Sequence, residues 1–250
     1  MSDATVNGQR RRRASFLAGL AVMAVALSPP LDAASGRRLS AHMVQHLLFM
    51  LAAAPLLVAA RPGAWLLEAL PVPARARFGR TLHRPAARRA RRLITHPVVV
   101  LTLAVGGFWA WHLPRLYQAA LANPVVHMAE HGTFLAGALL FWGIVLDPGP
   151  RRRLGLGATC GFVFAAMLVN IWLAAGLAFA TTPLYTVYAG RSAGALADQQ
   201  LAGVIMWLPA DVVYFVTLLA LLRRILGDLD ARLPRRVAPE ELARLGEAGR

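Results

Sequence analysis

The chain has 250 residues, of which 57% are hydrophobic and only 16% are charged, and its mean hydropathy is +0.51. Soluble domains carry roughly a quarter of their residues as Asp, Glu, Lys or Arg, so this composition argues against a soluble globule, a disordered chain or a disulfide-rich secreted domain. The 27 basic residues, all of them Arg, exceed the 12 acidic ones and give a net charge of +15. These figures favour a membrane protein. In such a protein a surplus of basic residues indicates which loops are cytoplasmic.

Six stretches are apolar enough to be membrane-spanning helices, since a span needs about 20 residues. In chain order they are residues 14–31, 39–60, 93–113, 124–146, a helix within 154–182, and 199–222. Backbone groups in the hydrocarbon core must find partners within the protein, and helices satisfy this requirement within each span. We therefore expect an all-α fold, a polytopic transmembrane helix bundle of about six spans.

The arginines orient these spans. Four groups, at residues 10–13, 61–92, 151–153 and from 223 onward, hold 23 of the 27 basic residues. All four groups are cytoplasmic if the N-terminus is cytoplasmic, whereas the inverted topology would violate the positive-inside tendency at every loop. We predict a multi-pass protein of the cell inner (plasma) membrane with both termini in the cytoplasm.

The same pattern divides the chain into three parts. They are a cytoplasmic Arg-rich N-terminus at 1–13, a transmembrane helical domain at 14–226 with an Arg-rich cytoplasmic loop at about 61–92, and a charged cytoplasmic tail at 227–250. The first span also resembles a cleavable signal peptide, but we favour a retained helix. For the Arg-rich loop we expect contact with anionic lipid headgroups rather than with nucleic acid.

Five of the seven histidines fall at the predicted outer ends of three spans. His42 and His46 begin the second span, His127 and His131 begin the fourth, and His112 ends the third. Each pair is spaced as His-x-x-x-His, which puts both rings on one helix face with Cβ atoms about 6 Å apart. Two such pairs on neighbouring helices can surround one ion, and imidazole suits copper, zinc, iron and nickel.

Other polar residues near these ends are candidates for supporting roles. Asp32 and Asp198, at the outer ends of the first and sixth spans, are secondary candidates for ligands. Glu130 and Gln45 can orient imidazoles or supply oxygen donors. Two alternatives stay open: the histidines serve only as polar packing groups, or two of them ligate a haem iron. The lone Cys160 excludes a Cys-x-x-Cys-His haem attachment.

Two polar residues lie deeper in the spans. Asn170 is expected to form a hydrogen bond between helices. Asp211 lies midway along the sixth span, near a kink expected at Pro209, and its role is open. The sequence contains no P-loop, no Gly-x-Ser-x-Gly and no His-Glu-x-x-His motif, so nothing in it indicates an enzyme.

Motifs spread from the first span to the sixth resemble one known family. They are Ser28-Pro29-Pro30-Leu31-Asp32, Ser40-Ala41-His42-Met43-Val44-Gln45-His46-Leu47-Leu48, Trp111-His112-Leu113-Pro114 with Leu116-Tyr117, the segment 127–131 with Phe141-Trp142, and Asp198-Gln199-Gln200-Leu201-Ala202-Gly203 with Met206-Trp207. In this order they are similar to the CtaG family, the multi-spanning cytochrome c oxidase assembly factors associated with caa-type oxidases.

The resemblance implies a bacterial inner-membrane protein that is needed for active haem–copper oxidase and acts as a copper chaperone, not as an enzyme. It implies copper as the bound metal, delivered to the binuclear centre of the oxidase. By motif position, it carries a metal-site role to His42, His46, His112, His127 and His131, with Asp32 and Asp198 as secondary candidates. The expected partners are the haem–copper oxidase catalytic subunit, a periplasmic copper donor and membrane lipid, with no nucleic acid. A copper transporter and a haem-binding electron carrier remain the alternatives.

Overall fold

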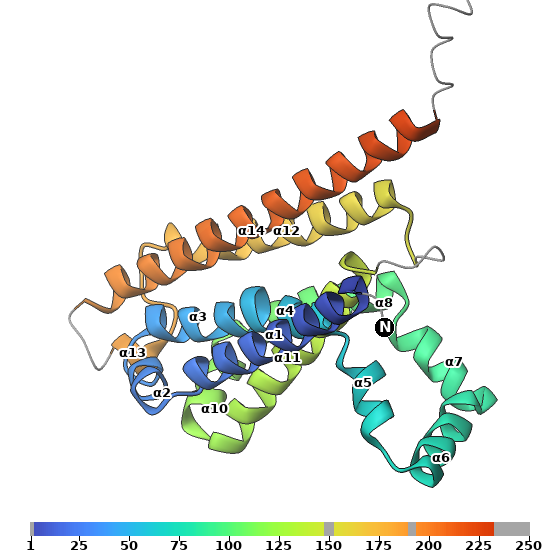
Figure 1. The fold of residues 1–250 in the computed structure, drawn as a ribbon. Coiled ribbons are helices and arrows are strands. Elements are labelled where there is room, and N and C mark those ends of the chain that lie inside the picture. The colour runs from blue at the N-terminus through green and yellow to red at the C-terminus, as the bar shows by residue number, and fades with distance from the viewer. Residues whose placement is uncertain (1–2, 148–152, 190–193, 233–250) are drawn as a thin grey trace, which may run out of the picture.

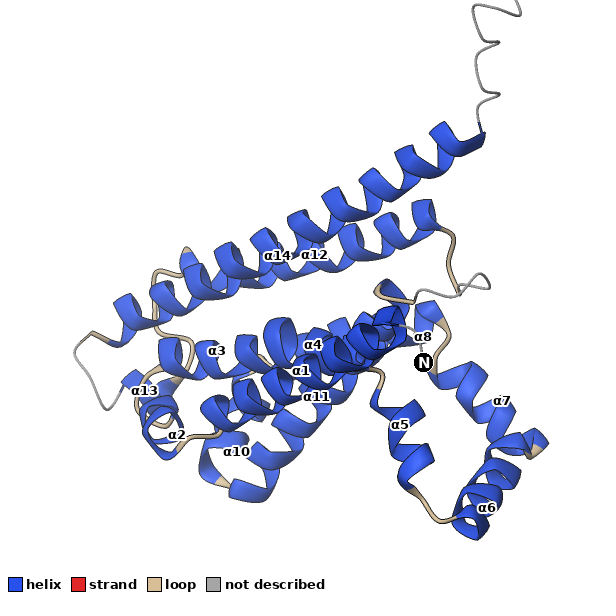
Figure 2. Cartoon of the chain, in the orientation of Figure 1, coloured by secondary structure: helices blue, strands red, loops and turns tan. Residues whose placement is uncertain are grey.

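The computed structural model describes residues 3–147, 153–189 and 194–232, and every regular element in these parts of the chain is a helix (Figure 2). The first half contains α1 (Asp3–Ala26), α2 (Pro29–Ser35), α3 (Leu39–Leu47), the π-helical segment η1 (Leu48–Ala53), α4 (Ala54–Ala60), α5 (Pro62–Ala69), α6 (Val72–His83) and α7 (Pro85–Ile94). The second half contains α8 (Pro97–Leu101), the π-helical segment η2 (Thr102–Gly106), α9 (Gly107–Trp111), α10 (Pro114–Ala122), α11 (Pro124–Val145), α12 (Leu156–Ala178), α13 (Thr186–Ala189) and α14 (Ala195–Arg232). The expected all-α fold is confirmed.

Four continuous helical runs are long and apolar enough to cross a membrane: Leu39–Ala60, Pro124–Val145, Leu156–Ala178 and Ala195–Ala231. Two further spans are formed if each of two bent pairs counts as one, namely α1 with α2, bent by 50°, and α7 with α8–α9, bent by 56°. The count of four to six agrees with the expected bundle. By length and composition, these helices are those of a membrane protein.

Several helix boundaries differ from the predicted ones. The first helix already begins at Asp3, so the arginines at 10–13 are helical. Pro97 bends the chain after α7, so the third span is shorter than predicted. In contrast, Pro209 does not interrupt α14, which runs on to Arg232. The predicted tail lies mostly at 233–250, outside the described residues, as do Arg151, Arg152 and Arg191.

The helices form two groups that lie side by side (Figure 1). One group contains α1, α3–η1–α4, α8–η2–α9 and α11, and the other contains the antiparallel pair α12 and α14. The pair approaches closely at Gly203, where an added Cβ would lie only 2.4 Å from the backbone nitrogen of Ala178. A hydrogen bond of 3.2 Å from Asn170 Nδ2 to the Met206 carbonyl also joins this pair, which confirms the predicted interhelical role of Asn170.

The two ends of the bundle differ in the elements that cover them. The short helices α2, α10 and α13 cover one end, whereas α5, α6 and α7 extend from the other (Figure 1). The loop predicted at 61–92 is thus largely helical, and α6 and α7 have no buried residues. Its arginines lie at the end of the bundle opposite α2 and α10 (Figure 1).

Substitution of Gly203 tests the close contact between α12 and α14. We expect Gly203→Ala to lower the free energy of unfolding in detergent by about 1–3 kcal/mol, because backbone atoms of α12 leave no room for a methyl group. The matched control is Gly161→Ala on α12, where an added Cβ has nothing within 4 Å. Thermal unfolding of both variants checks the prediction, and equal midpoints would contradict it.

Candidate metal centre

The two helices that carry the histidine pairs begin alike. α3 starts at Leu39 and α11 starts at Pro124, and the first histidine, His42 or His127, is the fourth residue of its helix. The second histidine of each pair follows one turn later. Both pairs therefore lie at the same depth below one end of the bundle, the end covered by α2 and α10 (Figure 1).

Caps at both helix starts fix this depth. In α11, Asn123 Oδ1 accepts a hydrogen bond of 2.9 Å from the backbone N–H of Val125. In α3 the cap comes from a distant element, because Asp198 of α14 accepts a hydrogen bond of 2.7 Å from Leu39 N–H and another from the Ser40 hydroxyl. Such caps satisfy backbone donors that a helix leaves unpaired at its start. They also hold α14 against α3.

The four paired histidines come together between α3 and α11. The ring centroids are 4.2 Å apart within each pair, for His42 with His46 and for His127 with His131. Across the two helices, the His42 and His127 rings are 5.2 Å apart, and those of His46 and His131 are 5.3 Å apart. The predicted convergence of the two pairs is therefore present in the fold.

Two groups of three residues have the geometry to hold a metal ion. One is His42, His46 and His131, and the other is His42, His127 and Glu130; in each group the donor atoms lie within 4.8 Å of one another. Three nitrogens bound to one ion at about 2.0 Å lie about 3.5 Å apart. Side-chain shifts of about 1 Å would therefore close either group around an ion, and the donors present fit a transition metal.

The polar side chains of this cluster are buried but lack hydrogen-bond partners among the described residues, which is unusual for packed polar side chains. His42, His46 and Glu130 are at most 1% exposed. Both nitrogens of His42 and of His46, Nε2 of His127 and of His131, and both oxygens of Glu130 have no hydrogen-bond partner among the described residues. Each such group costs roughly 1–3 kcal/mol when it is buried unpaired. A cation that takes up these lone pairs would remove that cost.

Glu130 is the residue that sequence reasoning underrated. It was expected to orient imidazoles or supply an oxygen, and in the fold it lies among the candidate ligands. Its Oε2 is 3.6 Å from His42 Nε2 and its Oε1 is 4.0 Å from His46 Nε2, both too long for a hydrogen bond. The sequence did carry a signal, since His127 and Glu130 are three residues apart and so share a helix face.

His112 lies beside the cluster but in neither group. Its Nδ1 is 2.7 Å from the Phe108 carbonyl, which leaves Nε2 buried without a partner in the described residues. Its ring is 6.3 Å from that of Phe134, which in turn packs at 4.6 Å against His46. His112 is thus a neighbour of the candidate ligands rather than one of them in this geometry.

Two tyrosines form the wall between the cluster and the end of the bundle. The Tyr117 ring lies 5.1 Å from His42 and 4.2 Å from Tyr185, and the Tyr185 hydroxyl donates a 2.9 Å hydrogen bond to the His112 carbonyl. Burial raises the pKa of both phenols above their usual value. Both therefore remain neutral at physiological pH and add no charge next to the histidines.

π-helical segments border the cluster on the side away from that end. η1 directly follows the turn that holds His46, and η2 lies one turn before His112. A π-helical turn is rare and occurs frequently at functional sites, because it shifts the register of the side chains around it. Within η1, Phe49 packs against the ring of His131 at 4.9 Å.

The two carboxylates expected as secondary ligands are not brought into the cluster. Asp198 caps α3, and Asp32 is exposed on α2. Within the described ranges neither belongs to a group of three possible ligands. The methionines next to the histidines differ, since Met43 is fully buried in the adjoining apolar core whereas Met128 is 68% exposed.

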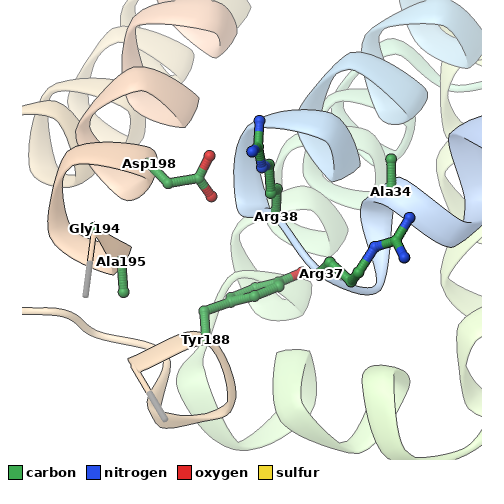
Figure 3. Close-up of a pocket in the computed structure, with 7 residues that line it drawn as sticks. All are labelled: Ala34, Arg37, Arg38, Tyr188, Gly194, Ala195 and Asp198. Atoms are coloured by element: carbon green, nitrogen blue, oxygen red, sulfur yellow. The ribbon is translucent and has the colours of Figure 1, made fainter. Parts of the chain in front are cut away.

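A polar pocket lies over the same end of the bundle. It has a volume of about 680 Å³ and is lined by Ala34, Arg37, Arg38, Tyr188, Gly194, Ala195 and Asp198 (Figure 3). The Tyr188 hydroxyl is 3.1 Å from that of Tyr117, whose ring contacts His42. One layer of tyrosines therefore separates the pocket from the histidines.

Comparison with known families gives this site its context. The sequence profile of the family described as cytochrome c oxidase caa3 assembly factor (Caa3_CtaG) matches residues 3–228. The chain belongs to this family. The match includes α1 to α13, the histidine cluster and most of α14. It confirms the resemblance of the motifs to those of cytochrome c oxidase assembly factors. No curated protein and no solved structure matches the chain significantly.

The buried ligand atoms of this assembly factor should lower the stability of the metal-free protein, which a substitution can test. We expect His46→Leu to raise the free energy of unfolding in the presence of a chelator by about 1–3 kcal/mol, because it removes two buried nitrogens that have no partner. The control is His83→Leu, since His83 is exposed and should change little. Chelator-treated protein is compared by thermal unfolding, and a clear loss of stability in His46→Leu would show that the ring stabilises the apoprotein.

Proposed function

We propose that this cytochrome c oxidase assembly factor binds copper at the histidine cluster and delivers it to the catalytic subunit of a haem–copper oxidase. The observation that carries the proposal is the set of buried, unpaired donors on α3 and α11. Copper is cargo in this function, so the centre must both accept and release the ion. No covalent chemistry is required of the chain.

The composition of the cluster supports copper. Imidazole nitrogens are good ligands for copper in either oxidation state, and a site that lacks thiolates binds less tightly than a closed Cys-rich site. The lone Cys160 lies on α12 and belongs to neither group. A moderate, exchangeable affinity is what transfer to another protein needs.

The exposure of the ligands supports transfer from the side of α11. His42, His46 and Glu130 are fully buried, whereas His127 and His131 are only half-buried. A partner or a donor that approaches α11 would therefore meet the rim of the cluster first. A bound copper ion can exchange these partly exposed histidines for the ligands of a partner without any opening of the bundle.

The distribution of arginine supports a periplasmic location for the centre. The arginine groups at 10–13 and 61–92 lie at the end opposite α2 and α10 (Figure 1), and basic loops favour the cytoplasm. The histidine cluster would then open toward the periplasm, where a copper donor can reach it. The membrane in question is the bacterial inner membrane, with both termini in the cytoplasm.

The double substitution His46→Ala with His131→Ala tests the proposal. We expect purified double-variant protein to bind copper with lower affinity than the wild type, and the membranes to show reduced oxidase activity, because one group loses two of its three ligands. The protein should still accumulate in the membrane. His83→Ala, outside the cluster, is the matched control and should leave copper affinity and oxidase activity unchanged.

Several results would overturn the proposal. Normal oxidase activity in the double variant would separate the cluster from assembly. Copper uptake into proteoliposomes that contain the protein alone would indicate transport instead of delivery. A Soret band in the purified protein that disappears in the double variant would indicate a haem-binding electron carrier.

A further inference from the structure

The candidate metal centre consists of two overlapping ligand sets rather than one. The outer set is His42, His127 and Glu130, and the inner set is His42, His46 and His131. His42 is the residue that they share. Each set alone provides three donors, so a partner can add a further ligand of its own.

The two sets are offset along the helices. His127 begins the pair on α11, and His46 and His131 lie one turn deeper than the first histidine of their pairs. The Glu130 carboxylate lies between the two levels, with one oxygen 3.6 Å from His42 and the other 4.0 Å from His46. An ion bound to the outer set is therefore already next to the ligands of the inner set.

The sets also differ in donor chemistry. The outer set combines two imidazoles with a carboxylate, and the inner set consists of three imidazoles. Carboxylate is the harder ligand, whereas imidazole is the better match for copper. Exchange from the outer to the inner set replaces an oxygen donor with a nitrogen donor, which favours movement inward.

We propose that one copper ion occupies these two sets in turn, entering at the outer set and leaving from the inner set, with His42 bound throughout. The proposal rests on copper delivery as the function. The step breaks the bonds to His127 and Glu130 and forms bonds to His46 and His131, and the oxidation state of copper does not change. Because His42 is retained, the ion is never released into the bundle.

The exposure of the ligands allows copper to be exchanged at both sets, and the donor chemistry gives the movement its direction. Each set contains one half-buried histidine on α11, His127 in the outer set and His131 in the inner set, and the remaining ligands are buried. Copper can therefore be accepted at His127 and given up at His131, one turn further along the same helix. Simultaneous occupation is disfavoured, since two cations at this separation repel each other and compete for His42.

The test compares variants of the full-length protein in detergent, with cuprous copper as the probe. Glu130→Gln and His127→Ala alter the outer set, His46→Ala and His131→Ala alter the inner set, and His42→Ala alters both. Each protein is titrated against a chromophoric cuprous chelator, and the bound copper is examined by X-ray absorption. Size-exclusion profiles confirm that each variant is folded, and Glu130→Gln keeps the shape of the side chain it replaces.

We expect the wild type to bind one equivalent of copper, mostly with three nitrogen ligands. Each single-set variant should keep one equivalent with affinity lowered by about 10–100-fold. Copper in the inner-set variants should show the scattering of two imidazole rings, and copper in the outer-set variants that of three. His42→Ala should lose more affinity than any of the others. Two equivalents in the wild type, or complete loss of copper in all single-set variants, would overturn the two-set proposal. A wild type that binds no copper would instead overturn the proposed function.

Discussion

The burial of imidazole and carboxylate groups without partners is the constraint that organises this protein. Polar groups at membrane depth are expensive, and a chain keeps them when they serve a purpose. The helices bury the side chains of His42, His46 and Glu130, but the described residues offer their nitrogen and oxygen atoms no hydrogen-bond partner. The caps at the starts of α3 and α11, the tyrosine wall and the π-helical turns hold these groups close together. Rigid surroundings are needed, because unpaired donors would otherwise move toward solvent or toward backbone groups.

The fixed depth of the two histidine pairs follows from contacts far apart in the sequence. Asp198 holds the start of α3 from α14, 159 positions away along the chain from Leu39. Gln45, between the two histidines of α3, donates a 2.7 Å hydrogen bond to the Ala26 carbonyl at the end of α1. The spans at both ends of the chain therefore contribute to a site whose ligands all come from α3 and α11. The family match includes both of these spans.

Much of this arrangement could be predicted from the sequence, because hydrophobic length and helical periodicity are local properties. The run Leu39–Ala60 agrees with its predicted bounds, and the spacing of His42 and His46 placed both rings on one face. The role of Asp198 could not be predicted, since a carboxylate at a helix end serves equally well as a ligand or as a cap for another helix. The π-helical segments have no local signal. Glu130 was expected to orient imidazoles or supply an oxygen donor, and its three-residue spacing from His127 brings it to the cluster.

The central claim is that the donors on α3 and α11 bind a single copper ion. Anomalous diffraction at the copper absorption edge, from crystals of the protein loaded with copper, tests this claim most directly. The account predicts anomalous density between the two helices, within bonding distance of His42. Density confined to the polar pocket or to the exposed histidines of the opposite end, with none next to His42, would contradict it.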